Sequence, residues 1–289
     1  MHQGLYAAAT AYIIWGLFPL YFHQLAHIGA LELVMHRSVW ALLFMLGVLA
    51  WQKRWAWLVD VMRQPRVLAI ATLSVALLSV NWLLYVWAVN NGRVLEASLG
   101  YFINPLFNVL LGVLVLHERP RRLQWAALAL AAFGVVWLGW MAGAAPWVSL
   151  ALAVSFGLYG LLKKTAALGA LEGLTLETLL LAPLAVPALL WMSTHGGSLA
   201  TADTRTWLWL LLAGPITAVP LLLFAYGAQR IRLSTLGLLQ YLGPSLQFAL
   251  GVWVFHEPMS QARLAGFAFI WLALIIYSAE TLRQHRASS

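Results

Sequence analysis

Hydrophobic residues run through almost the whole chain in long, unbroken segments that short polar turns separate. These segments have the length of helical membrane spans, about 20 residues for a hydrocarbon core of roughly 30 Å. They lack the alternating polarity of membrane β-strands. We therefore predict an all-α polytopic membrane protein with ten transmembrane helices. Their predicted ranges are 4–25, 30–51, 67–91, 95–117, 122–141, 146–165, 173–193, 206–228, 233–256 and 262–281.

Composition supports this interpretation and excludes several classes of protein. Of the 289 residues, 63% are hydrophobic and 9% are charged, whereas a soluble domain has about 25% charged residues. Ten spans with their turns occupy the whole chain, so no room is left for a nucleotide-binding motor domain. Neither a phosphate-binding nor a dinucleotide-binding glycine motif is present. The absence of cysteine excludes disulfides and thiolate chemistry.

The basic residues predict the orientation of the spans. If the N-terminus is cytoplasmic, the outer turns hold only Arg93, Arg205 and Arg263, and Arg37 lies within a span. The inner turns and the tail then hold Lys53, Arg54, Arg63, Arg66, Arg119, Arg121, Arg122, Lys163, Lys164, Arg230, Arg232, Arg283 and Arg286. Because basic residues favour the cytoplasmic side, we predict a multi-pass protein of the bacterial inner membrane with both termini in the cytoplasm. The net charge of +8 then reflects orientation in a lipid bilayer, and no nucleic-acid partner is predicted.

The chain contains an internal repeat at an offset of 139 residues. The matched pairs are Arg93 and Arg232, Leu99 and Leu238, Pro105 and Pro244, Gly112-Val113 and Gly251-Val252, and His117-Glu118 and His256-Glu257. Residues 1–142 and 143–289 then form two five-helix repeats. Since five is odd, the second repeat is inverted relative to the first, which is an architecture of secondary transporters. A duplicated scaffold without transport is the alternative.

Polar side chains within two repeat-related spans predict a binding cavity. Tyr101, Asn104 and Asn108 are spaced to share one helical face, and Gln240 and Gln247 occupy the matching positions of the second repeat. Intramembrane polar groups usually face the interior or a water-filled cavity. The alternative is that each amide only joins neighbouring helices.

Two repeat-related prolines, Pro105 and Pro244, are the predicted hinges, because each removes one backbone hydrogen bond and permits a bend.

Asn81 and Tyr85 share a face of the third span. Aromatic and amide groups together suit an organic solute. The predicted substrate contacts are Trp15, Asn81, Tyr85, Tyr101, Asn104, Asn108, Gln240, Tyr241 and Gln247.

The charged residues within spans are Glu32, Arg37 and Glu177. Glu32 and His36 are four residues apart, so we expect a hydrogen bond between them. Arg37 lies about 10 Å in from the outer helix end, and we expect it to pair with Glu96, Glu177 or helix-terminal carbonyls. It either contacts an anion in the transport path or clamps helices together, and we favour the clamp. Glu32, Glu96 and Glu177 are the candidate carboxylates if protons are the coupling ion.

His117-Glu118 and His256-Glu257 fall on opposite sides of the predicted membrane, so they cannot form one site. A metal site needs three or four convergent ligands, and we expect these pairs to cap helices or form turn contacts. No metal, cofactor or enzymatic activity is predicted.

Several segments resemble one transporter family closely: "WAVNNGRVLEASLGYFINPLFNVLLGVLVLHERP" at 87–120, "AYIIWGLFPLYF" at 11–22, "HRSVW" at 36–40 and "RLSTLGLLQYLGP" at 232–244. The chain resembles the RarD branch of the EamA-type permeases, within the drug/metabolite transporter superfamily. The resemblance implies ten helices in two inverted repeats. It also implies a central cavity lined mainly by the first, third, fourth, sixth, eighth and ninth spans. The branch is labelled chloramphenicol-sensitive, which does not establish what is carried.

Together these observations predict a secondary transporter that moves a small organic metabolite or drug-like solute across the inner membrane by alternating access. The alternative is an intramembrane protein that binds a ligand or regulates without cycling. Transport against a gradient separates the two.

Overall fold

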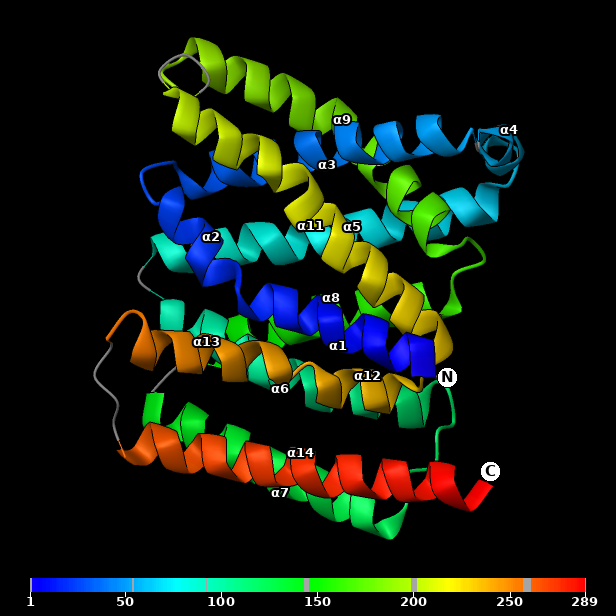
Figure 1. The fold of residues 1–289 in the computed structure, drawn as a ribbon, viewed down its shortest axis with the longest axis vertical. Coiled ribbons are helices and arrows are strands. Elements are labelled where there is room, and N and C mark those ends of the chain that lie inside the picture. The colour runs from blue at the N-terminus through cyan, green and yellow to red at the C-terminus, as the bar shows by residue number, and fades with distance from the viewer. Residues whose placement is uncertain are drawn as a thin grey trace.

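The helices of the computed structural model run side by side, and both chain termini lie at the same end of them (Figure 1). The structure describes residues 2–53, 55–91, 93–142, 146–198, 202–256 and 261–288. Every regular element in these ranges is a helix, which confirms the all-helical class. The helices are α1 (His2–Gly16), α2 (Phe18–Gln24), α3 (Ala30–Gln52), α4 (Ala56–Met62), α5 (Pro65–Asn90), α6 (Val94–Leu114), α7 (Arg122–Ala142), α8 (Pro146–Thr165), α9 (Ala170–Thr194), α11 (Thr204–Arg230), α12 (Leu233–Leu239), α13 (Leu242–Trp253) and α14 (Gln261–Ser288).

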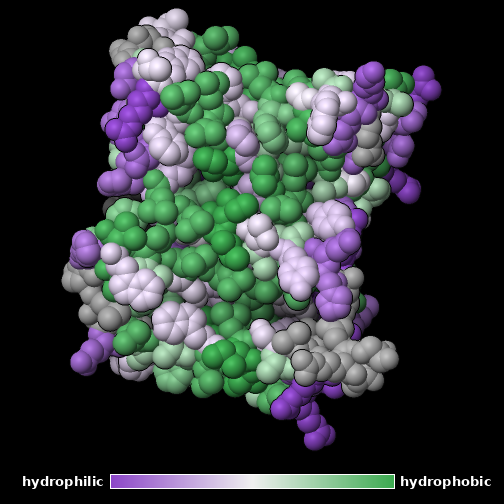
Figure 2. Space-filling view, viewed as in Figure 1, coloured by the Kyte–Doolittle hydropathy of each residue, from purple (hydrophilic) through white to green (hydrophobic). Residues whose placement is uncertain are grey.

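The molecular surface is that of a membrane protein. Figure 2 shows hydrophilic residues gathered at the two ends of the helices and a hydrophobic band between them. Large apolar side chains such as Val136, Leu184 and Ile275 are exposed within helices, as expected where hydrocarbon is the solvent. Among the described residues, seven spans are long and apolar enough to cross a membrane, and two shorter apolar stretches, Leu99–Leu114 and Leu264–Glu280, accompany them.

Two predicted spans are broken where one helix was expected. The first divides at Leu17, between α1 and α2, and Pro19 lies in the first turn of α2. The ninth divides at Gln240-Tyr241, and Pro244 lies in the first turn of α13. A proline is tolerated in a first turn because its missing N–H would have no partner there. By contrast, Pro105 lies inside the continuous helix α6, so the two predicted hinge prolines occupy unlike positions.

The turn expected between the second and third spans contains a short helix, α4, that the hydrophobic pattern did not predict. It is too short to cross the membrane. Trp51 and Trp55 beside it are exposed, as is typical of tryptophans at a membrane interface.

Helices from the two halves of the sequence interleave. Helix α3 packs against α9 and α11, α6 packs against α8 and α12, α1 packs against α11 and α13, and α7 packs against α14. Small residues permit the close approach of α1 and α11, where Ala8 lies against Gly227. Aromatic rings fill the centre: Tyr12, Tyr159 and Phe224 are almost fully buried. The core therefore lies between the halves rather than within either one.

Carboxylates cap two helix N-termini. Asp203 Oδ1 accepts a hydrogen bond from Thr206 N at 2.8 Å, and hydrogen bonds from Thr206 hold the pKa of Asp203 below its usual value. Glu118 accepts from the backbone N–H groups of Leu233 at 2.6 Å and Ser234 at 3.0 Å. It therefore caps α12, which follows it by more than a hundred residues.

The turn role expected for the His-Glu pairs is confirmed at Glu118, which is a cap. His117 has a φ of 53° and His256 a φ of 52°, the left-handed conformation in which helices commonly end. Glu257 lies outside the described residues.

We predict that Gly214→Ala destabilises the protein. A methyl group at Gly214 in α11 would lie 2.5 Å from the Trp40 carbonyl oxygen of α3, so one helix must shift, at a cost of ~1–3 kcal/mol. The matched control is Gly47→Ala within α3, where a methyl group meets nothing within 4 Å. Melting temperatures in detergent measure both variants, and equal values would contradict the proposed close contact of α3 and α11.

Candidate functional site

Arg37 lies at the centre of a cluster of side chains from several helices. Its Nε donates a hydrogen bond to Thr217 Oγ1 of α11 at 3.1 Å. The guanidinium carbon lies 5.5 Å from the ring centroid of Phe18, 5.4 Å from that of Phe22 and 5.2 Å from that of Trp82. These are cation–π distances. The arginine thus connects α2, α3, α5 and α11.

Two tyrosines extend this cluster toward α6. The rings of Tyr85 and Tyr101 are in edge contact, with centroids 5.9 Å apart, and their hydroxyl groups lie near Arg37, as does that of Tyr21. Even so, Tyr85 is 38% and Tyr101 36% exposed, so part of each tyrosine remains accessible. We call Phe18, Phe22, Arg37, Trp82, Tyr85, Tyr101 and Thr217 the arginine cluster.

The expected pairing of Arg37 with Glu177 is wrong. Glu177 Oε1 instead accepts from Lys163 Nζ of α8 at 2.6 Å, and both side chains are buried. The partner of Arg37 is the hydroxyl of Thr217. The side chain of Glu96 lies outside the described residues. The contact with Thr217 joins α3 to α11, so the arginine does clamp two helices.

The Lys163–Glu177 pair lies deep between α8 and α9. The hydroxyl groups of Ser74 and Tyr159 approach the carboxylate, yet Glu177 Oε2 has no hydrogen bond of good geometry within the described structure. The sequence did not indicate this role of Lys163, because a lysine near a helix end is indistinguishable from an anchoring residue of the cytoplasmic side. It points inward because α8 and α9 both pack against α5 and α11.

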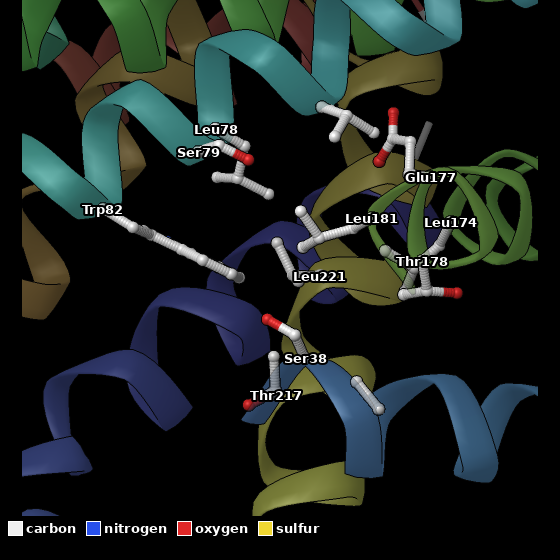
Figure 3. A pocket seen from close by; sticks show the side chains of 12 residues that line it. Ser38, Leu78, Ser79, Trp82, Leu174, Glu177, Thr178, Leu181, Thr217 and Leu221 are labelled. Carbon is white, nitrogen blue, oxygen red and sulfur yellow. The ribbon is translucent and has the colours of Figure 1, made fainter. Parts of the chain in front are cut away.

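A narrow pocket connects the arginine cluster with this ion pair (Figure 3). It lies between α3, α5, α9 and α11, and its volume of about 30 Å³ is enough for a water molecule or two but not for an organic solute. Trp82 and Thr217 belong to both the pocket and the arginine cluster. Glu177 lies at the opposite end from Trp82 (Figure 3).

The predicted amides lie in interfaces between helices. Asn108 Nδ2 donates to Asn104 Oδ1 at 2.9 Å and to Gln240 Oε1 at 3.3 Å. Asn104 Nδ2 donates to the Ala153 carbonyl at 3.2 Å. All three amides are buried and join α6 to α8 and α12. Their contacts are those of interhelical hydrogen bonds, and contact with a substrate stays a prediction.

The other predicted contacts are divided among separate places. Asn81 Nδ2 donates to the Leu152 carbonyl and to Ser155 Oγ, each at 2.9 Å. The Trp15 ring contacts the buried rings of Tyr12, Phe156 and Phe224. The hydroxyl of the buried Tyr241 donates to the Phe102 carbonyl at 3.1 Å. Gln247 is exposed and donates to the Trp15 carbonyl at 3.3 Å. Of the nine predicted contacts, the structure therefore brings together Asn104, Asn108 and Gln240 as one group, Tyr85 and Tyr101 as a second, and Trp15 and Gln247 as a third.

Glu32 is held by Ser198, in the segment that follows α9. Its Oε1 accepts from Ser198 N at 2.6 Å and from Ser198 Oγ at 2.7 Å. His36 Nε2 lies 3.8 Å from the same oxygen and 3.4 Å from Ser198 Oγ. The expected hydrogen bond between Glu32 and His36 is therefore wrong: the two side chains lie close, but Glu32 bonds Ser198 instead. No group of three or more His, Cys, Asp or Glu side chains that could hold a metal occurs in the described part of the chain.

Comparison with known proteins gives consistent matches. Residues 2–140 match the model of the EamA-like transporter family. An uncharacterized transporter of Pseudomonas aeruginosa is 46% identical over 99% of this chain and 96% of its own length. The protein RarD of Streptomyces exfoliatus is 46% identical over 99% of this chain and 91% of its own length. One protein of known crystal structure shares the fold with a TM-score of 0.72 and 20% identity, over 96% of this chain and 97% of that one.

We predict that Asn108→Leu lowers the melting temperature. It removes the donor to both Asn104 and Gln240, and a buried interhelical hydrogen bond in a membrane protein contributes on average ~0.6 kcal/mol, with ~1–3 kcal/mol where an acceptor is left unsatisfied. The control is Asn91→Leu, since Asn91 is exposed and donates only within its own helix end, to the Trp87 carbonyl. Equal melting temperatures for the two variants would show that the network is not stabilising.

Proposed function

Because the chain belongs to the EamA-like transporter family, in its RarD-like group, we propose that this membrane transporter is a secondary transporter. It moves a small organic solute across the bacterial inner membrane by alternating access. Binding takes place in a central cavity between two inverted five-helix repeats, 1–142 and 143–289. The observation that carries the proposal is the internal repeat at an offset of 139 residues, because inverted repeats of this kind give a transporter its two alternative conformations.

The packing of the helices supports two inverted repeats. In the predicted order of spans, α3 and α9 are the second members of each repeat, α6 and α12–α13 the fourth, and α7 and α14 the fifth. Each of these repeat-related pairs is in contact: α3 with α9, α6 with α12 and α7 with α14. A two-fold axis lying between the halves in the membrane plane accounts for such contacts, since elements near the axis meet their own counterparts.

The two ends of the helices differ in closure. At the end that carries the termini, Gly4 of α1 lies against Arg230 and Ile231. Lys164 Nζ donates to the carbonyls of Ala228 and Ile231 at 3.3 and 2.5 Å. The arginine cluster, with its exposed tyrosines, lies toward the other end. With the termini in the cytoplasm, as the basic residues predict, these contacts support the proposal that the cytoplasmic end is the closed one in this conformation.

Transport by the purified protein tests the proposal. In proteoliposomes, we expect saturable uptake of at least one labelled solute from a panel of aromatic and amphipathic metabolites, together with counterflow against a gradient. Asn104→Leu and Gln240→Leu should each reduce that uptake about tenfold, the effect of losing ~1.4 kcal/mol of binding. Asn91→Leu serves as the control, and rates are compared per inserted, folded protein.

Unchanged uptake in both variants would overturn the assignment of these amides to the cavity. Binding of a solute without any flux would favour the alternative, a non-cycling intramembrane protein that binds a ligand or regulates. Flux without counterflow would indicate a channel.

We further propose protons as the coupling ion, with the Lys163–Glu177 pair as the coupling site. A carboxylate within the membrane is costly and is usually functional. Glu177 is buried, pairs with one lysine and lines a pocket with room for water. Trp82 and Thr217 of the arginine cluster line the same pocket. A change of charge at Glu177 therefore acts on groups that contact Arg37.

Glu177→Gln should abolish the effect of a proton gradient on net flux while leaving exchange without a gradient intact, because a glutamine releases no proton. The double variant Lys163→Gln/Glu177→Gln avoids an unpaired buried lysine, whose cost is ~3–5 kcal/mol, and should behave alike. Glu32→Gln is the control, because Ser198 already holds that carboxylate. Gradient-driven flux that persists in both Glu177 variants would exclude this coupling site.

A further inference from the structure

The guanidinium of Arg37 lacks a counter-ion in the described part of the molecule. Its Nε bonds Thr217, the rings of Phe18, Phe22 and Trp82 lie against it, and the neutral hydroxyl groups of Tyr21, Tyr85 and Tyr101 lie near it. Two of the carboxylates in the predicted spans, those of Glu32 and Glu177, are engaged elsewhere. Glu32 accepts from Ser198 and Glu177 accepts from Lys163.

A charge without a counter-ion in this position destabilises the folded protein. Charges within membrane spans are therefore rare and are usually retained for a function. Removing a cation from water costs several kcal/mol or more without a partner. The ring contacts offset only part of that cost, at about 0.5–2 kcal/mol each. The two terminal nitrogens of Arg37 have no hydrogen-bond acceptor within the described structure, although an arginine can donate two parallel hydrogen bonds to one carboxylate. The cluster therefore has positive charge and donors to spare.

The aromatic side chains beside Arg37 indicate what kind of group is attached to the acidic group of the ligand. Trp82, Tyr85 and Tyr101 offer flat faces, and the tyrosines remain partly exposed beside the charge. Flat, apolar surface beside a donor pair suits a planar ring attached to an acidic group. The cluster holds one cation, so a monoanion neutralises it. A phosphate ester, at about −1.5 to −2 near neutral pH, would leave charge uncompensated.

We propose that Arg37 binds the acidic group of the transported solute, and that the substrates are aromatic monocarboxylates. The carboxylate pairs with the terminal nitrogens of Arg37, and the ring lies on the accessible faces of Tyr85 and Tyr101. This inference rests on the proposed transport function, because it names the class of solute that the transporter carries. It assigns Arg37 a role in binding in addition to its bond to Thr217.

The first test compares two ligands that differ only in charge. Equilibrium binding to the purified full chain in detergent is measured by calorimetry for 3-phenylpropionate and for its uncharged amide, 3-phenylpropionamide. The expected result is at least tenfold tighter binding of the carboxylate. This comparison uses the unaltered protein, so it does not depend on the folding of any variant. Equal binding of the two ligands, or no binding of the carboxylate and of further aryl monocarboxylates, overturns the proposal.

The second test locates the binding site. Arg37→Gln should remove the preference for the carboxylate, and Arg37→Lys should keep part of it, because lysine retains the charge without the paired donors. Arg205→Gln is the matched control: it removes the same charge from an exposed residue that bonds Gln24. A carboxylate preference that survives Arg37→Gln, or that Arg205→Gln abolishes equally, overturns the assignment. Tighter binding of phenyl phosphate than of the carboxylate overturns the monoanion argument.

Flux measurements separate this inference from the proposed function. Saturable flux of neutral solutes, with no preference for carboxylates, leaves a transporter and removes the inference about its substrates. Arg37-dependent binding of carboxylates without flux of any solute removes the transporter and leaves the binding site.

Discussion

Within a membrane, a polar group without a hydrogen-bond partner inside the protein costs several kcal/mol, because lipid tails offer none. The packing of this molecule follows from that requirement. The side-chain amide of Asn81 bonds the backbone of α8, and Lys164 bonds the last carbonyls of α11. Glu118 supplies acceptors to the first N–H groups of α12. Each of these contacts joins segments that are far apart in sequence, so satisfying polar groups and assembling the bundle are one process.

The same requirement makes the broken helices informative. A break such as that at Gln240-Tyr241 disturbs the backbone ladder within the apolar band, and the structure compensates locally, since Gly243 N donates to the Gln240 carbonyl at 3.1 Å. The Gln240 side chain also takes part in the amide network through Asn108. Binding sites of transporters commonly lie at such discontinuous helices.

The Lys163–Glu177 pair and Arg37 have different surroundings. The Lys163–Glu177 pair is internally neutral and buried, whereas Arg37 has a hydroxyl and three rings for partners. A water-sized pocket lies between them. In the proposed mechanism the two sites have different roles. Arg37 binds the anionic group of the solute, and Glu177 exchanges a proton. The shared residues Trp82 and Thr217 are the physical connection between the two.

The sequence by itself determined the helical class, the apolar segments and the internal repeat, because these depend on residue type and spacing alone. It also indicated the turn role of the His-Glu pairs, which is confirmed at Glu118. Only the tertiary structure decided the partners: that Glu177 pairs with Lys163 and not with Arg37, that Phe18 and Phe22 surround the arginine, and that the first and ninth predicted spans are broken. The physical reason is that hydropathy reports how a residue partitions into lipid. The partner of a buried charge depends on which helix faces it, and the interleaving of the two halves sets that arrangement.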